Sequence, residues 1–199
     1  MKKISILLCL LFVQFVLLGQ KDSALERRLA EFMQVNDEMD LNKVLDYTYP
    51  KLYTVVPRDQ MLEVLQNTFE NENMSIRLDS VHINTIYPVF KVENGSYAKV
   101  IYSMNMIMAF KTNNKDSLTP EKKKERDDFM ISSLSEQYGA GNVSIDPVSG
   151  DLKIKMISPM VAVKDEYAKQ WSFVNFKEND PLTNRLFSKE ILKKLAMYK

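Results

Sequence analysis

Apolar residues recur at helical spacing over the first part of the chain and at strand spacing over most of the rest. Between residue 23 and about residue 36, apolar side chains fall at positions i, i+4, i+7 and i+8, which predicts an amphipathic helix. Its apolar face consists of Leu25, Leu29, Phe32 and Met33.

Two further helices are predicted before the first strand. Asp40 is a suitable N-cap for a short helix, and Tyr49-Pro50 interrupts that helix because the residue before a proline resists the α region. Pro57 suits the first turn of a third helix. The apolar face of this third helix consists of Met61, Leu62, Leu65 and Phe69.

From Met74 the apolar period changes to two, which predicts strands. The alternation holds up to Leu78 and resumes with the opposite parity at Val81, so we expect a bulge or sharp bend near Ser80. Farther on, Glu93-Asn94-Gly95-Ser96 separates two apolar runs. An Asn-Gly pair in this setting predicts a hairpin.

Residues 113–128 form the most polar stretch, and Thr119-Pro120-Glu121 within it has the composition of a helix start. A helix over about 119–138 has an apolar face only in its second half, and Gly139 suits its end. Acids and bases alternate in its first half, which predicts a solvated helix end rather than a basic binding patch.

The apolar pattern in the last part of the chain predicts more strands and a short C-terminal helix. Strands are expected from residue 143, over residues 152–163 and over residues 171–176. Pro159 should mark an edge or a bulge in the second of these, while Asp180-Pro181 and Ser188 are expected to cap a short turn and the closing helix. Helices followed mainly by strands indicate a single α+β domain over residues 21–199.

The first twenty residues have the composition of a secretory signal peptide. Lys2 and Lys3 precede an apolar run from Ile4 to Leu18, and a helix of that length rises only about 22 Å, which is less than the roughly 30 Å of a bilayer core. We therefore predict a cleaved bacterial-type signal at 1–20, a periplasmic or secreted protein, and no stable membrane insertion after cleavage. An uncleaved anchor is the alternative.

Composition excludes several classes of protein. A chain with 45% hydrophobic residues, 27 basic and 26 acidic residues is neither disordered nor a polytopic membrane protein, and it lacks the basic excess of a nucleic-acid binder. The single cysteine, Cys9, lies in the predicted signal, so the domain has neither a disulfide nor a cysteine-based zinc site. One histidine cannot form a multi-histidine metal site, and we predict no metal and no cofactor.

The order of these elements resembles the nuclear transport factor 2-like superfamily. The resemblance rests on the helical segment 40–69 with Tyr49-Pro50 inside it, the strand series 74–176, and Leu186-Phe187 before a closing helix. It implies N-terminal helices packed into a strongly curved, mostly antiparallel sheet, which together form a cone with a pocket. The helix near 119–138 would be an insertion at the rim, and a different curved α+β sheet, such as a cystatin-like one, remains the alternative.

One strand carries a row of apolar side chains on a single face, which we interpret as the wall of an apolar pocket. Methionine is unbranched and adapts to irregular shapes, so a methionine-rich wall is easily deformed. The candidate pocket-lining residues are Tyr102, Met104, Met106, Met108, Phe110 and, from the last strand, Trp171. The alternative is that this row meets the N-terminal helices as ordinary core.

Acid and base candidates are few. The resemblance implies that an enzyme of this superfamily, such as ketosteroid isomerase, would place a carboxylate inside the cone. Asp46, beside Tyr47 and Tyr49, and Asp79, on the predicted bent strand, are the two carboxylates that could occupy such a place. His82 is a third, weaker candidate, and we expect it to be a partly exposed strand residue.

The sequence thus leaves two functions open. The first is an exported, non-catalytic module that binds a small hydrophobic ligand or an envelope protein in an apolar cone. The second is a cofactor-free isomerase or hydrolase that uses Asp46 or Asp79. Homodimerisation through an uncovered apolar strand face is a further possibility.

Overall fold

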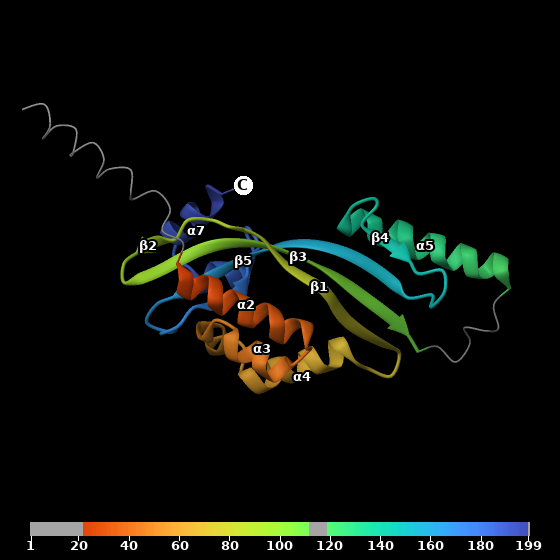
Figure 1. Cartoon of the computed structure of the whole chain (residues 1–199), viewed down its shortest axis with the longest axis horizontal. Coiled ribbons are helices and arrows are strands. Elements are labelled where there is room, and N and C mark those ends of the chain that lie inside the picture. Colours follow the sequence, from red (N-terminus) through yellow and green to blue (C-terminus); the bar gives the residue numbers. More distant parts are fainter. Residues whose placement is uncertain (1–21, 112–118, 199) are drawn as a thin grey trace, which may run out of the picture.

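A computed structural model describes residues 22–111 and 119–198, and it confirms an α+β fold with an open antiparallel sheet (Figure 1). The strands lie in the order β1-β3-β5-β4, while β2 pairs with β3 and β6 pairs with β5. The predicted signal peptide and the start of the polar stretch lie outside the described residues. Within the described part of the chain, no helix combines the length and apolar character required to cross a bilayer.

The N-terminal helices form where the sequence predicts them. They are α2 (Ser23–Asp37), α3 (Leu41–Tyr47), the 3-10 turn η2 (Pro50–Thr54) and α4 (Arg58–Phe69). Asp40 caps α3 by accepting a hydrogen bond from the Lys43 backbone N–H at 3.1 Å. Pro57 is the residue before α4 rather than its first helical residue, and Pro50 begins η2. Figure 1 shows α2, α3 and α4 together beneath one half of the sheet.

The predicted bulge in the first strand is confirmed, and it controls which residues face the helices. Strand β1 (Met74–Ile86) pairs with β3 (Gly95–Phe110), and the register shifts between Asp79 and His82, where Ser80 has a φ of 56°. Leu78 lies opposite Met106 and Ile83 lies opposite Tyr102. Because the bulge inserts one residue, apolar residues of opposite sequence parity end on the same face of the sheet.

The predicted hairpin forms, but glycine has a different role in it. Strand β2 (Phe90–Val92) pairs with the start of β3, and Val92 lies opposite Gly95, so the loop is Glu93-Asn94. The residue with positive φ is Glu93, at 50°. Gly95 is buried beneath the ring of Tyr97, where a Cβ atom would overlap that ring. A side chain is therefore excluded at this position by close packing.

The remaining strands and helices also follow the predicted order. They are α5 (Pro120–Tyr138), β4 (Val143–Ile145), β5 (Leu152–Lys164), β6 (Ser172–Asn175), α6 (Pro181–Leu186) and α7 (Lys189–Ala196). Pro159 causes no bulge, since β5 keeps its register with β3 throughout. Pro159 lies between the segment of β5 that pairs with β4 and the segment that pairs with β6. On that side β5 has no partner strand over a short stretch, and Pro159 belongs to this sheet edge.

Three apolar clusters hold these elements together. On one face, α2 packs Leu25 and Leu29 against the sheet, and at the far end of the sheet α5 covers a second cluster around Leu152 and Ile154. On the other face, η2, α6 and α7 enclose a third cluster that includes Val163. The stretch of sheet between the α2 and α5 clusters is where the candidate site lies.

Candidate functional site

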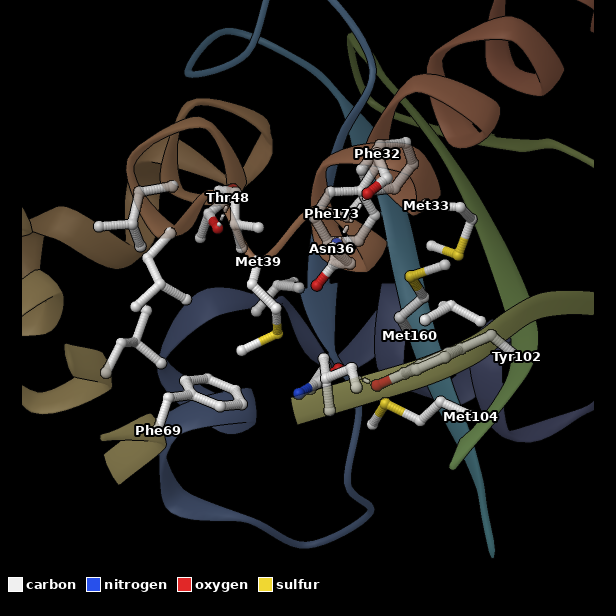
Figure 2. Close-up of a pocket in the computed structure, with 18 of the residues that line it drawn as sticks. Phe32, Met33, Asn36, Met39, Thr48, Phe69, Tyr102, Met104, Met160 and Phe173 are labelled. Carbon is white, nitrogen blue, oxygen red and sulfur yellow. Dashed lines mark hydrogen bonds between the residues drawn. The ribbon is translucent and has the colours of Figure 1, made fainter. Parts of the chain in front are cut away.

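A cavity of about 430 Å³ separates helices α2, α3 and α4 from the middle of the sheet (Figure 2). This volume lies in the range of small-molecule sites, which is about 300–1,000 Å³. The residues that line it are Phe32, Met33, Asn36, Met39, Leu41, Val44, Leu45, Thr48, Leu52, Met61, Leu65, Thr68, Phe69, Ile76, Leu78, Val81, Tyr102, Met104, Met106, Met156, Met160, Phe173, Val174, Asn175 and Leu182.

The side chains that form the sheet wall of the cavity point the same way because they alternate along their strands. Tyr102, Met104 and Met106 alternate along β3 and therefore share one face. Met104 lies directly opposite Met156 of β5. The aromatic ring of Phe173, on β6, closes this wall and stacks on Phe32 of α2 with a centroid distance of 4.8 Å.

The opposite wall is made by α2, α3 and α4, of which α4 is packed lightly. None of the residues of α4 is buried, although Met61, Leu65 and Phe69 form an apolar stripe on one side of it. That stripe faces the cavity, so its side chains remain accessible from inside. Helix α4 therefore bounds the cavity without sealing it by close packing.

Methionine dominates the lining. Seven methionines line the cavity, and they come from α2, the α2–α3 turn, α4, β3 and β5. Thioether side chains have three rotatable bonds and adapt to ligands of different shape. A wall of this kind suits a flexible or variable apolar ligand better than one rigid ligand.

A small number of polar groups interrupt the apolar lining. The Tyr102 hydroxyl donates a hydrogen bond to Asn175 Oδ1 at 3.0 Å. Burial raises the pKa of Tyr102 above its ordinary value, and a hydrogen bond from the Ser158 side chain partly opposes this rise. Tyr102 is therefore neutral at physiological pH and remains a hydrogen-bond donor.

Asn36 supplies a second polar group from the helix side. Its Nδ2 donates to the Phe32 carbonyl oxygen at 2.7 Å, which fixes the orientation of the carboxamide. In Figure 2 the carboxamide oxygen points away from Phe32, toward the centre of the cavity. Thr48, nearby on the same wall, uses its hydroxyl to bond the Val44 carbonyl oxygen at 3.0 Å.

Among the described residues, the lining contains no Asp, Glu, Lys, Arg or His side chain, and Tyr102 is the one titratable group. A charged ligand group inside the cavity would lose its hydration without gaining a counter-charge from the described residues. Likewise, within residues 22–111 and 119–198, no three His, Cys, Asp or Glu side chains are grouped as metal ligands.

The structure divides the candidate pocket residues into two groups. Tyr102, Met104 and Met106 line the cavity. Met108 and Phe110 lie farther along the same face and pack in the cluster beneath α5. Trp171 is 3% exposed and packs with the α2 cluster instead, where its Nε1 has no hydrogen-bond partner among the described residues.

The acid and base candidates lie outside the cavity lining. The Asp46 carboxylate is exposed and pairs with the Arg58 guanidinium at 2.8 Å. Asp79 lies opposite Asn105, and the bulge separates it from His82, which is exposed and lies opposite Ser103. The structure therefore does not bring these three side chains together at one site.

Sequence reasoning missed the two asparagines of the cavity and the contribution of β5. Asn36 interrupts an amphipathic helix, and Asn175 ends a short strand, so neither has a distinctive local pattern. Met156 and Met160 do lie on the apolar alternation of β5, and that alternation was the available signal for them.

Comparison of this chain with protein-family models, with curated proteins and with solved structures gives no match.

Proposed function

We propose that this protein is a non-catalytic binding module that holds a small hydrophobic molecule in the cavity between α2–α4 and the sheet. The observation that carries this proposal is the lining itself, which is mostly apolar, rich in methionine and, over the described residues, without a carboxylate, imidazole or ammonium group. Large apolar pockets with a few polar groups are the usual form of small-molecule sites.

The element order supports membership of the nuclear transport factor 2-like superfamily. Three helical segments precede a bent antiparallel sheet, and the bulge at Ser80 directs the apolar residues of β1 toward those helices. Helix α5 lies between β3 and β4, where we place an insertion relative to the minimal fold. Residues 1–20, as a signal peptide, would direct the module to the periplasm or the exterior of the cell.

Catalysis is the less favoured alternative. A cofactor-free isomerase or hydrolase needs an acid or base in contact with its substrate. Asp46 and Asp79 do not belong to the cavity lining, and Asp46 is exposed and paired with Arg58. Binding requires neither residue.

The experiment uses two neighbouring residues of β5 that lie on opposite faces of the sheet. Met156 lines the cavity, whereas Ile157 is 64% exposed. In Met156→Trp the larger side chain fills the cavity, and we expect the affinity for a solvent-sensitive naphthylamine fluorophore to fall at least tenfold. Ile157→Trp is the matched control and should bind the fluorophore like the wild type.

Native mass spectrometry of the protein purified from its own host complements this titration. A co-purified small molecule that is lost in Met156→Trp and kept in Ile157→Trp would support the proposal. Wild-type protein that neither carries a small molecule nor binds the fluorophore would overturn it, and so would equal binding by both variants.

A further inference from the structure

The polar groups of the cavity restrict the ligand more than its apolar walls do. Asn175 Oδ1 already accepts the hydrogen bond of the Tyr102 hydroxyl, and this contact sets the orientation of the carboxamide. Its Nδ2 makes no hydrogen bond with the described residues, although Asn175 belongs to the cavity lining. Because Asn175 is exposed, the sheet wall offers this uncharged donor where the cavity meets solvent.

The helix wall offers the complementary group. Asn36 Nδ2 is engaged by the Phe32 carbonyl oxygen, so the oxygen of this carboxamide is the atom turned toward the cavity. It accepts no hydrogen bond from the described residues. Apolar walls therefore carry one neutral donor and one neutral acceptor.

Charge complementarity excludes ionised ligands. In the part of the lining that the structure describes, a carboxylate would meet two amides and a phenol but no cation, and an ammonium group would meet no anion. Removing an ion from water is costly unless a counter-charge replaces its hydration, whereas a ketone, ester, amide or alcohol needs only ordinary hydrogen bonds.

We propose that the ligand is a neutral, mainly hydrocarbon molecule whose uncharged oxygen accepts a hydrogen bond from Asn175 Nδ2. Asn36 Oδ1 can in addition accept a hydrogen bond from a ligand hydroxyl or amide N–H. This inference rests on the proposed binding function and adds the chemical class of the ligand. It selects esters, ketones, amides and alcohols over free fatty acids and amines. The seven lining methionines allow the hydrocarbon part to vary in shape.

The test compares three probes with the same chain length: methyl decanoate, decanoate and decane, each displacing the fluorophore from the full chain at pH 8. We expect methyl decanoate to bind at least tenfold more tightly than decanoate, because only the latter is charged. We also expect it to bind several-fold more tightly than decane, because only the ester accepts a hydrogen bond.

Two variants locate the polar contact. Asn175→Leu is near-isosteric and should reduce the preference for the ester over decane toward unity while decane binding persists. Asn36→Leu should leave this preference unchanged, because the ester has no hydrogen to donate to Asn36 Oδ1. Asn105→Leu is the control, because Asn105 lies on β3 outside the cavity lining. Circular dichroism establishes that each variant is folded. The comparison of the three probes on the wild-type protein tests the neutrality of the ligand without any variant.

The outcomes separate this inference from the proposed function. If no probe displaces the fluorophore, the binding function itself fails. If decanoate binds as tightly as its methyl ester, the pocket stands and the neutrality of the ligand is refuted. If decane binds as tightly as the ester, or if Asn175→Leu leaves the ratio unchanged, the polar contact is refuted.

Discussion

The two faces of the sheet are both apolar, but one is packed closed and the other encloses a cavity. On the closed face, the rings of Tyr49 and Phe187 stack with a centroid distance of 5.9 Å and an interplanar angle of 3°. Leu195 of α7 and Val163 of β5 are both 0% exposed there. On the cavity face, α4 has no buried residue, and seven methionines line the cavity beside the single stacked pair Phe32–Phe173.

Alternation of apolar residues along the strands therefore does not by itself decide whether a face of the sheet becomes close-packed core. Helix α7 buries Ile191 and Leu195 within the closed cluster, whereas α4 buries no residue and lines the cavity, and only Met61 of its apolar stripe also packs against that cluster. Flat rings and branched side chains interlock at close range, while methionine leaves adaptable space. We therefore expect stability to depend mainly on the closed face and ligand binding to depend on the cavity face.

Truncating one leucine on each face, the buried Leu195 and the half-buried Leu65, should give the strongest contrast in stability. Leu195→Ala should lower the free energy of unfolding by about 2–5 kcal/mol, because it leaves a void in a fully buried cluster. Leu65→Ala, on α4, should lower it by only about 1 kcal/mol or less, because that side chain already borders empty space. Urea denaturation of both variants measures the difference.

Equal losses in the two variants would contradict the comparison, since they would mean that α4 is packed as firmly as α7. The fluorophore titration provides the second readout. Leu65→Ala should alter its affinity, whereas Leu195→Ala should leave it unchanged under conditions where the protein is folded.

Enlarging a side chain is the second way to test the contrast. Val163→Phe should destabilise the protein by about 2 kcal/mol, because the closed cluster has no room for a ring. Met104→Phe places a ring against the cavity and should change stability by less than about 1 kcal/mol. Thermal unfolding of the two variants measures this, and a larger loss in Met104→Phe would show that the cavity is not available space.

Most elements were predictable because their signals are local. The N-caps Asp40, Thr119 and Asp180 each accept backbone hydrogen bonds at the start of the expected helix. The bulge at Ser80 was predictable because the apolar parity changes on either side of it. Capping and alternation act over a few residues, so the sequence displays them directly.

The limits of the cavity were not predictable in the same way. The row from Tyr102 to Phe110 has one uniform pattern, yet its last residues pack beneath α5, its first residues face α2–α4, and Met106 contributes to both regions. Where α5 docks depends on contacts distant in sequence. Trp171 likewise packs beneath α2, and Asn175 meets Tyr102 only because β6 pairs with β5.

The hydrogen bonds of two tyrosines, one on each face of the sheet, should differ less in their contribution to stability. The Tyr49 hydroxyl donates to Asp165 Oδ2 at 2.5 Å, and the same carboxylate accepts the Tyr167 and Ala168 backbone N–H groups through Oδ1. Tyr49→Phe should cost about 1.5 kcal/mol, because a hydrogen bond to a charged group is lost.

Tyr102→Phe should cost less, about 0.5 kcal/mol, because its partner Asn175 is exposed and can bond to water instead. The two variants are compared by urea denaturation at pH 7. A larger cost for Tyr102→Phe would mean that the cavity face contributes more to stability than its packing indicates.

The smallest expected effect is the response of the closed face to alkaline pH. Burial raises the pKa of Tyr97 to about 12, and burial together with the hydrogen bond to Asp165 raises the pKa of Tyr49 further above its ordinary value. In the unfolded chain both phenols titrate near pH 10. Above that pH the unfolded chain has lost protons that the folded protein retains, so the free energy of unfolding should fall as pH rises from 10 toward 12.

Replacing Tyr97 by phenylalanine removes one of these phenols without changing the ring that covers Gly95. The decline in unfolding free energy between pH 10 and 12 should then be shallower in Tyr97→Phe than in the wild type, whereas the two proteins should have parallel pH dependence below pH 9. Urea midpoints measured across this range test the expectation, and curves that remain parallel up to pH 12 would show that Tyr97 ionises as readily in the folded protein as in the unfolded chain. Tyr97 lies in the closed cluster and contacts the ring of Phe187 edge-on. Such a result would therefore mean that water reaches the closed face, which would contradict the difference in packing between the two faces.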